Sequence, residues 1–297
     1  MIYICVLNYE NAEYTLACLD SLLKLRDVEF RILLIDNASS DDSMARLSAY
    51  ANEHAALVRL FSLKRNLGYA GGNNVGLKYA LSQNDCDYAW VLNNDTLVEP
   101  GALKALVAYM ESNPQVGICG SKLVYAWDRS RLQGYGGFYN RWIGWNSNCV
   151  REQEIEKIDY VSGAAAFVRR EFLERVGLMS EDYFLYFEEL DWAERARGIF
   201  RIGCEPRSVV YHWEGASIGA QHGKSGEKSI LSDYYSVRNR LLFTRRYHPW
   251  CLPSVYVMLF LTIANRLRRK QWDRILVILK LMVGIKDYRF EHPRVLV

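Results

Sequence analysis

The sequence of 297 residues has no Cys-x-x-Cys pair and no cluster of cysteines and histidines with the spacing of a structural zinc site. Its seven cysteines stand singly, at positions 5, 18, 86, 119, 149, 204 and 251. An odd number of scattered cysteines argues against a disulfide framework. We therefore expect reduced, mostly buried thiols in a cytosolic protein.

Other familiar signatures are also missing. No Gly-Lys-Ser/Thr follows the glycine-rich loop at 66–74, which excludes a Walker site, and there is no G-x-G-x-x-G fingerprint. The apolar run Ile2–Leu7 has neither basic residues before it nor a cleavage site after it, so we expect a β-strand rather than a signal peptide. No internal repeat is present. Half the residues are hydrophobic and 24% are charged, which is globular composition and excludes disorder, a collagen-like repeat and a coiled coil.

Charge is distributed unevenly along the chain. Residues 1–232 carry 24 Lys and Arg against 30 Asp and Glu, a net charge of −6, whereas residues 233–297 carry 13 against 4, a net charge of +9. An acidic body followed by a basic tail indicates an anionic partner for the tail, which would be either nucleic acid or a membrane surface.

Apolar, β-forming runs alternate with segments of helical periodicity in the first half of the chain. Strands are expected at Ile2–Leu7, Arg31–Asp36, Leu57–Leu63 and Tyr88–Asn93, and helices around Leu16–Leu23, from Asp41 or Asp42 to Tyr50, at Gly71–Leu81 and at Pro100–Asn113. Repeated units of this length predict an α/β protein with a mostly parallel central sheet and helices on both faces.

The pattern changes after residue 123. Residues 124–160 are rich in Trp, Tyr, Gly and Asn and show little periodicity, which suits either a sugar-binding surface or ordinary core aromatics. Beyond them we expect a strand at Tyr160–Arg169, a helix after Arg170, a strand at Ser208–His212 and a mobile loop over Glu214–Ser232.

Polar side chains stand where several of these strands end. Because ligands of open α/β sheets bind beyond the carboxyl ends of the strands, the candidates are Leu7-Asn8-Tyr9, Asp36-Asn37 and Asn93-Asn94-Asp95. His212, which ends an expected strand before the loop over Glu214–Ser232, is a further candidate. Asp36 could accept from a base or a ribose hydroxyl, and Asp95 is a hard oxygen ligand for Mg²⁺ or Mn²⁺. Each also has a purely structural reading: the two aspartates as turn or helix caps, and His212 as a hydrogen-bonded core residue.

An acidic cluster lies in an aromatic setting further along the chain. Glu188, Glu189 and Asp191 follow the run Tyr183–Phe187, and burial beside aromatic rings and like charges raises a carboxyl pKa toward that of a general base. The alternative is the exposed first turn of a helix over Leu190–Arg197, where acids favour the helix dipole.

Taken in order, these segments resemble the inverting family 2 glycosyltransferases of the GT-A fold, in particular the rhamnosyltransferase-like branch. The matching segments are Val6-Leu7-Asn8-Tyr9, Asp36-Asn37-Ala38-Ser39-Ser40-Asp41, Asn66–Asn74, Leu92-Asn93-Asn94-Asp95, Val161–Ala165, Phe184–Asp191, Tyr211-His212, Tyr234-Tyr235 and Arg238-Asn239. The resemblance covers roughly residues 1–245. It implies a Rossmann-like nucleotide-binding sheet and transfer of a sugar from a nucleotide-diphosphate donor without a covalent intermediate.

The resemblance also implies roles for individual residues. The nucleotide would be held by Leu7, Tyr9, Asp36, Asn66, Gly68, Asn73 and Asn94. Asp95 matches the metal-binding carboxylate of the family's Asp-x-Asp motif, whose first position is here Asn93, and His212 matches a metal-binding histidine, so Mg²⁺ or Mn²⁺ is the implied cofactor. Glu189 occupies the position of the catalytic base, normally an aspartate, and the neighbouring Asp191 is the second candidate for that role.

The basic tail contains two apolar stretches. Val255–Ala264 is shorter than the roughly 20 residues that span a bilayer and is followed by Arg266, Arg268, Arg269 and Lys270, and Ile275–Ile285 is interrupted by Lys280. We expect helices that make a peripheral contact with an anionic membrane through residues 250–290. The alternative is packing on the catalytic domain or across a homodimer. No recognised nucleic-acid-binding module is present.

Together these observations predict a catalytic domain over 1–232, with a nucleotide-sugar half at 1–123 and an acceptor half at 124–232, and a helical extension over 233–297. The expected activity is inverting transfer from a donor such as dTDP-rhamnose or a UDP-hexose to a glycan or lipid-linked glycan, at the cytoplasmic face of the membrane, in surface polysaccharide biosynthesis. The alternative is a non-catalytic nucleotide-sugar-binding scaffold at the membrane.

Overall fold

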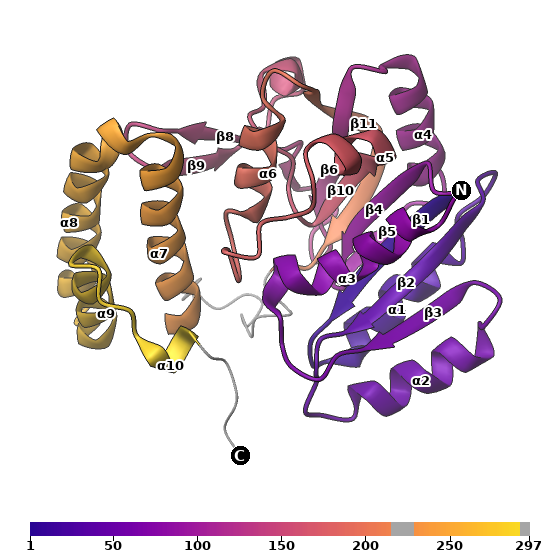
Figure 1. Cartoon of the computed structure of the whole chain (residues 1–297), viewed down its shortest axis with the longest axis horizontal. Coiled ribbons are helices and arrows are strands. Elements are labelled where there is room, and N and C mark those ends of the chain that lie inside the picture. Colours follow the sequence, from indigo (N-terminus) through magenta and orange to yellow (C-terminus); the bar gives the residue numbers. More distant parts are fainter. Residues whose placement is uncertain (215–228, 292–297) are drawn as a thin grey trace.

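The computed structural model describes residues 1–214 and 229–291 (Figure 1). Its centre is a nine-stranded sheet with the order β3-β2-β1-β4-β10-β6-β11-β5, and β7 pairs with β6 beside this path. The strands are β1 (Ile2–Asn8), β2 (Phe30–Asp36), β3 (Val58–Ser62), β4 (Tyr88–Asn93), β5 (Thr96–Val98), β6 (Val116–Tyr125), β7 (Leu132–Gly134), β10 (Ala165–Arg169) and β11 (Arg201–His212). A separate hairpin joins β8 (Gly137–Asn140) to β9 (Trp145–Asn148).

Helices cover both faces of the sheet, as the alternation of strands and helices predicts. One face carries α1 (Ala12–Leu22), α2 (Ser43–Glu53) and α4 (Ala102–Ser112), and the other carries α3 (Gly68–Ser82), α5 (Arg170–Arg175) and α6 (Glu188–Ala196). Successive strand residues point to opposite faces. Ile4 and Val6 of β1 therefore join the first core, whereas Tyr3 and Cys5 join the second. A 3₁₀ turn covers Glu152–Lys157.

The sheet is mixed rather than mostly parallel. Strands β1 to β4 pair in parallel, but β10 runs antiparallel to both β4 and β6, and β11 runs antiparallel to β5. The expected strand at Tyr160–Arg169 begins only at Ala165, and Tyr160 forms an isolated bridge with Gly137. The parallel half ends at the carboxyl edge of β4, where Asn93, Asn94 and Asp95 stand.

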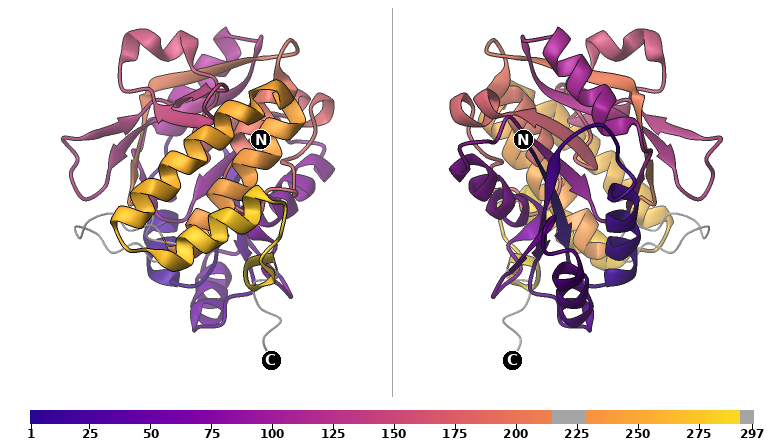
Figure 2. Two further views of the ribbon diagram at one scale, coloured as in Figure 1. Left: turned by 90° about the vertical axis from the view of Figure 1, so that its left-hand side faces the viewer. Right: turned by 90° about the vertical axis from the view of Figure 1, so that its right-hand side faces the viewer.

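The C-terminal residues form a second, helical layer (Figures 1 and 2). It consists of α7 (Ile230–Tyr247), a 3₁₀ turn at Pro249–Cys251, α8 (Leu252–Arg268), α9 (Trp272–Met282) and α10 (Tyr288–Glu291). The expected loop over Glu214–Ser232 lies mostly outside the described residues, and α7 already begins at Ile230. Phe243 of α7 packs on Tyr139 and Phe187, with ring centroids 5.1 and 5.7 Å apart, which joins this layer to the part of the chain built on the sheet.

The structure bears on the expectations for the cysteines and for the apolar run of the tail. All seven cysteines are buried and unpaired, as expected. The apolar part of the tail is longer than expected: among the described residues, the helical stretch Pro249–Arg268 is 20 residues long and is sufficiently long and apolar to cross a membrane by length and composition alone. This corrects the expectation that the run is too short.

Candidate functional site at the carboxyl edge of the sheet

A chain of hydrogen bonds links the carboxyl ends of β2, β1 and β4. The Asn8 side-chain amide donates to Asp36 Oδ1 at 2.9 Å, and its oxygen accepts from Thr15 Oγ1 at 2.6 Å. Thr15 in turn accepts from the Asn94 amide at 2.9 Å. All four residues are buried, so this polar layer is pre-formed beneath the edge of the sheet.

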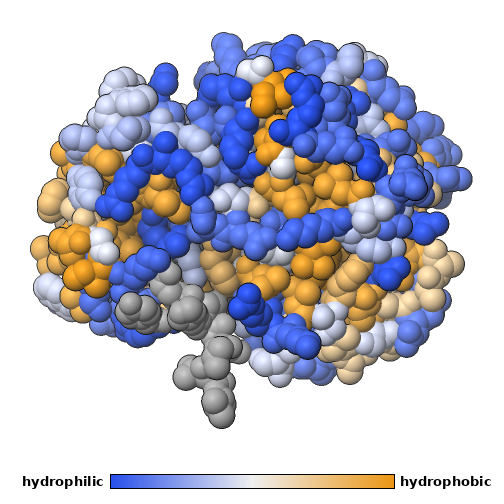
Figure 3. Space-filling model, viewed as in Figure 1, coloured by the Kyte–Doolittle hydropathy of each residue, from blue (hydrophilic) through white to orange (hydrophobic). Residues whose placement is uncertain are grey.

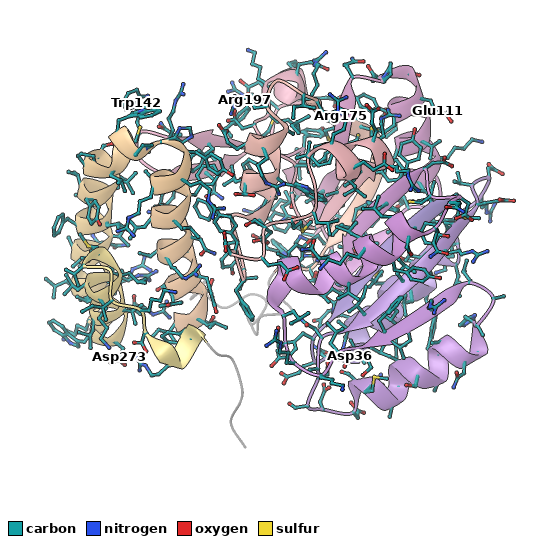
Figure 4. The ribbon with its side chains drawn as sticks, viewed as in Figure 1. Asp36, Glu111, Trp142, Arg175, Arg197 and Asp273 are labelled. Atoms are coloured by element: carbon teal, nitrogen blue, oxygen red, sulfur yellow. The ribbon has the colours of Figure 1, made fainter. Side chains whose placement is uncertain are left out.

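The network occupies much of the Asp36 carboxylate. Besides the bond from Asn8, Oδ1 accepts from Ser39 Oγ at 2.5 Å and Oδ2 accepts from the Ser39 backbone N–H at 3.1 Å. Figure 4 shows Asp36 at the lower end of the sheet, whereas Glu111 of α4 and Arg175 of α5 lie near the top of the view. Asp36 thus lies at the predicted edge of the sheet, where its hydrogen bonds from Ser39 hold the turn after β2.

The loop before α3 is shaped by close packing and by an asparagine pair. Asn37 donates its side-chain amide to Asn66 Oδ1 at 2.9 Å, and the same oxygen accepts from the Gly68 N–H at 2.8 Å. Gly68 has a φ of +73°, and a Cβ there would lie 2.4 Å from the Phe184 carbonyl oxygen. Only glycine fits this position without displacing the loop that leads into α6.

Helix α3 lies directly against β1 because its first turns carry almost no side-chain bulk. A Cβ on Gly72 would approach Leu7 Cδ1 to 2.5 Å, so the Leu7 side chain fills the place of the missing methyl group. Asn73 is buried and donates to the Tyr69 carbonyl at 3.0 Å. Leu7 thus packs against the start of α3, the helix that carries Gly68 and Asn73. Tyr9 follows β1 and is only partly buried.

His212 and Asp95 form a buried pair. The pairing of β11 with β5 places His212 opposite Thr96, and its Nε2 lies 3.3 Å from Asp95 Oδ1. On its other side, Nδ1 lies 3.0 Å from Gln133 Oε1. An Nδ1–H that donates to Gln133 leaves the Nε2 lone pair directed at the side of Asp95, which is the tautomer a metal-ligating histidine needs.

This donor set fits a divalent cation. A carboxylate and an imidazole whose second nitrogen is held by a neighbour are common ligands of Mn²⁺ and related ions, and Mg²⁺ typically takes one or two carboxylates together with substrate phosphates. Between residues 1–214 and 229–291, no three His, Cys, Asp or Glu side chains converge as a complete metal site. The remaining ligands would therefore be phosphate oxygens and water.

The two glutamates that begin α6, of which Glu188 is buried and Glu189 half-buried, follow a strained segment. Tyr186 and Phe187, which precede them, have φ values of 69° and 75°, in the left-handed region that non-glycine residues rarely occupy. Burial raises the pKa of Glu188 well above its ordinary value, with a further rise from Glu189, and burial raises the pKa of Glu189 to about 7. In each side chain, Oε2 is buried without a hydrogen-bond partner among the described residues.

Tyr69 connects the acids of α6 with the end of β4. Burial raises the pKa of Tyr69 well above its ordinary value, and the nearby charges of Glu188, Glu189 and Asp95 raise it further. Its hydroxyl donates to the Gly163 carbonyl at 2.5 Å. The carboxylates of Glu188, Glu189 and Asp95 are therefore near enough to this phenol to disfavour its ionisation.

Asp191 has different surroundings from Glu189. It is fully buried, and its carboxylate accepts from Arg195 Nε at 2.8 Å, from Tyr247 Oη at 2.7 Å and from Arg246 at 3.2 Å. Three donors, two of them from α7, occupy both oxygens. The structure therefore separates the two carboxylates that the sequence leaves as alternatives for the base.

Several partners of the site escaped sequence reasoning. Thr15 is one of several polar residues of α1, and Gln133 lies in the aromatic segment without a motif. Asn8, in contrast, belongs to the strand end Leu7-Asn8-Tyr9 that the sequence indicates. Tyr247 becomes a partner only through packing of α7 on α6, which local sequence does not reveal.

Comparison with known proteins agrees with this geometry. The model of glycosyl transferase family 2 matches residues 2–177. A low-salt glycan biosynthesis hexosyltransferase, Agl10, of Haloferax volcanii is 25% identical over 187 residues, 60% of this chain and 57% of its own length. The N-acetylglucosaminyl-diphospho-decaprenol L-rhamnosyltransferase of Mycobacterium tuberculosis is 27% identical over 236 residues, 69% of this chain and 75% of its own length.

Among solved structures, GalNAc-T7 with UDP, GalNAc and Mn²⁺ has a similar fold. The TM-score is 0.66 at 15% identity, and the match covers 86% of this chain and 50% of that one. The chain thus spans only about half the length of some of the proteins it matches. The structural likeness confirms the GT-A fold.

Proposed function

The chain belongs to glycosyl transferase family 2, and on that premise we propose that it moves a sugar from a nucleotide-diphosphate donor to a hydroxyl of a glycan or lipid-linked glycan in surface polysaccharide biosynthesis. The observation that carries the proposal is the buried pair of Asp95 and His212 at the end of β4, together with Glu189, whose charge and that of Asp95 both influence Tyr69. A base and an anion-neutralising site are the two elements that such a transfer requires.

Glu189 is the group we assign as the general base. Its pKa of about 7 leaves a substantial fraction of the carboxylate ionised near neutral pH, while the carboxylate remains basic enough to accept a proton. Asp191 is assigned as a positioning residue, because its oxygens are already held by Arg195, Arg246 and Tyr247. The proton of the attacking hydroxyl passes to Glu189 as the new glycosidic bond forms and the bond to the diphosphate breaks.

Asp95 and His212 are the residues that would hold Mg²⁺ or Mn²⁺. When bound, the ion supplies positive charge to the departing diphosphate. The chain's own contribution is orientation: Gln133 holds the imidazole, and both ligands are buried. Mn²⁺ in the GalNAc-T7 structure supports the assignment.

The edge of the sheet would bind the nucleotide. Leu7, Tyr9 and Asp36 lie at or just beyond the ends of β1 and β2, and Asn94 extends the polar layer to β4. The loop of Asn66, Gly68 and Asn73 would support the nucleotide from the α3 side, where its geometry is fixed by Asn37 and Phe184.

Displacement by the acceptor hydroxyl in a single step inverts the anomeric carbon, and no nucleophile is needed. One relative is a rhamnosyltransferase and another is a hexosyltransferase. The first donors to test are therefore dTDP-rhamnose and a UDP-hexose. The lipid-linked acceptor in the name of the mycobacterial relative supports an acceptor of that class.

Transfer assays with the purified chain test this proposal. The protein is incubated with Mn²⁺, an N-acetylglucosaminyl-diphospho-lipid acceptor and either dTDP-rhamnose or a UDP-hexose, and the acceptor is analysed by mass spectrometry. A mass increase of one sugar with release of nucleoside diphosphate is expected. The alternative function is a non-catalytic scaffold that binds a nucleotide sugar. It is supported by Asn93 and Glu189, which stand where the family has aspartates. It predicts calorimetric binding of a nucleoside diphosphate with no turnover of any donor.

A further inference from the structure

The outward face of the α8–α9 hairpin is apolar and uncovered. Trp250, Val257 and Leu261 line one side of α8 and the turn before it, and Trp272, Leu276 and Val283 line one side of α9, with exposed fractions from 52 to 73%. We call these six residues the hairpin face. In Figure 3, hydrophobic residues gather at the left edge of the molecule, over α8 and α9.

The hairpin has a separate inward side that makes its core. Val255 and Leu259 of α8 and Val277 and Ile278 of α9 are fully buried with Tyr235 of α7. Residues of the hairpin face recur at steps of four and seven on the opposite side of each helix. Figure 2 shows α8 and α9 side by side at the front of the helical layer, with their outer sides turned away from the sheet. Fold stability therefore does not account for the hairpin face.

Two buried acids of the helical layer form ion pairs with basic residues of the tail. Asp233 is buried and paired with Arg266 at 2.9 Å and Arg274 at 2.7 Å, and buried Asp287 is paired with Lys280 and Arg289. Part of the tail's positive charge is therefore used internally, which refines the expectation drawn from its net charge of +9.

The outer cations gather at one place. Arg268, Arg269 and Lys270 are exposed at the turn between α8 and α9. Within residues 250–290, all of which the structure describes, Asp273 is the one exposed acid. A compact basic cluster beside a broad apolar face complements an anionic lipid surface.

We propose that the hairpin face lies in the plane of an anionic membrane surface, with Trp250 and Trp272 at headgroup level and the turn 268–270 on anionic headgroups. The two tryptophans mark opposite ends of the antiparallel hairpin, and indole rings favour the membrane interface. This surface is independent of the sugar-transfer activity proposed above.

The same contacts favour an in-plane hairpin over a membrane-spanning α8. Although Pro249–Arg268 is long enough to span a bilayer, Val255 and Leu259 are buried in the protein, and the Arg266–Asp233 ion pair ties the end of α8 to α7. Crossing the membrane would break that pair and expose this core.

Flotation of the full chain with lipid vesicles tests the proposal. Binding is measured to phosphatidylcholine vesicles with and without phosphatidylglycerol, for the wild type, for Val257→Asp with Leu276→Asp, and for Arg268→Ser with Arg269→Ser and Lys270→Ser. The control is Leu23→Asp, an exposed leucine after α1. The wild type and the control should float with the anionic vesicles, and each multiple variant should bind at least about tenfold more weakly. Circular dichroism and melting curves confirm that the variants fold.

Other occupants of the hairpin face give different results. The proposal is contradicted if the wild type binds the two vesicle types equally, or binds neither. It is also contradicted if binding to the anionic vesicles does not weaken with added salt. A lipid-free dimer in sedimentation velocity that Val257→Asp with Leu276→Asp dissociates would assign the face to a second copy of the chain. A protein that resists alkaline extraction from cell membranes would have a spanning α8. Either result overturns the proposal.

Discussion

Glu188 and Glu189 are adjacent at the start of α6 but differ in burial and in the pKa of their carboxyl groups. Glu188 is the more deeply buried, and Glu189 keeps a pKa of about 7. Because a carboxyl with a raised pKa holds its proton in the folded state, Glu188 contributes stability that is fully present below its unfolded pKa and is lost as the pH rises through its folded pKa.

Glu188→Gln should therefore flatten the dependence of stability on pH. The wild-type free energy of unfolding should fall as the pH rises above the ordinary glutamate pKa of about 4.3, by up to about 1.4 kcal/mol per pH unit from this residue, and the variant should lack that part. Urea denaturation at several pH values measures the difference. Glu29→Gln, on an exposed acid, is the matched control and should follow the wild type. A variant curve parallel to the wild type would show that Glu188 is solvated.

Asp191→Asn tests the positioning role of the other carboxylate. The substitution keeps the shape but weakens the bonds from Arg195, Arg246 and Tyr247, so the free energy of unfolding should fall by about 1–3 kcal/mol. Asp182→Asn, which removes an exposed partner of the same Arg246, should cost less than about 1 kcal/mol. If Asp191→Asn melts like the wild type but abolishes transfer, Asp191 is the base and the assignment of Glu189 fails.

At the scale of elements, the loop at the start of α3 and the loop before α6 fit together at Gly68. Their contact depends on a positive φ and on the absence of a side chain next to the Phe184 carbonyl. This contact places the start of α3 beside the segment that leads into α6.

Gly68→Ala should therefore destabilise the protein by about 2–4 kcal/mol, from strain at φ +73° and overlap with Phe184. Gly101→Ala is the control, because a Cβ there meets nothing within 4 Å, and it should change the stability by less than about 0.5 kcal/mol. Thermal and urea unfolding of both variants measure the effect. Equal stability of the two variants would mean that the loops do not meet as described.

Sequence patterns predicted the elements whose signals are local. The apolar runs of β1, β2 and β4 end in polar residues, so both the strands and the positions of Asp36 and Asp95 could be predicted. The antiparallel insertion of β10 could not, because strand pairing depends on contacts distant in sequence. The three-residue strands β5 and β7 are too short to show a period. His212 was predicted as a strand end, whereas its distance to Asp95 required the fold.

At the scale of the whole molecule, α7 makes the helical layer part of the catalytic unit. The Asn239 side-chain amide donates to the carbonyls of Leu185 and Tyr186 at 2.8 and 2.9 Å, directly before the glutamates. The expected boundary at residue 232 therefore falls in the first turn of a helix that supports the site.

Ligand binding should stabilise the entire folded chain and should depend on the metal. With Mn²⁺ present, UDP or dTDP at about one hundred times its dissociation constant should raise the free energy of unfolding by about 2.7 kcal/mol, and excess EDTA should reduce the effect. His212→Ala should show a smaller shift with Mn²⁺ and little response to EDTA. Thermal melting measures each combination. Equal shifts with and without EDTA in the wild type would remove Asp95 and His212 from the metal site.

The most direct test of the central claim is the rate of donor-dependent nucleoside diphosphate release, measured against pH for the wild type and Glu189→Gln. The wild-type rate should rise with pH through the Glu189 pKa of about 7 and then level off, because the base acts only when ionised. Glu189→Gln should bind the donor equally well, react about 10²–10⁴ times more slowly and lose this dependence on pH. A Glu189→Gln rate equal to that of the wild type, with the same pH profile, would contradict the account.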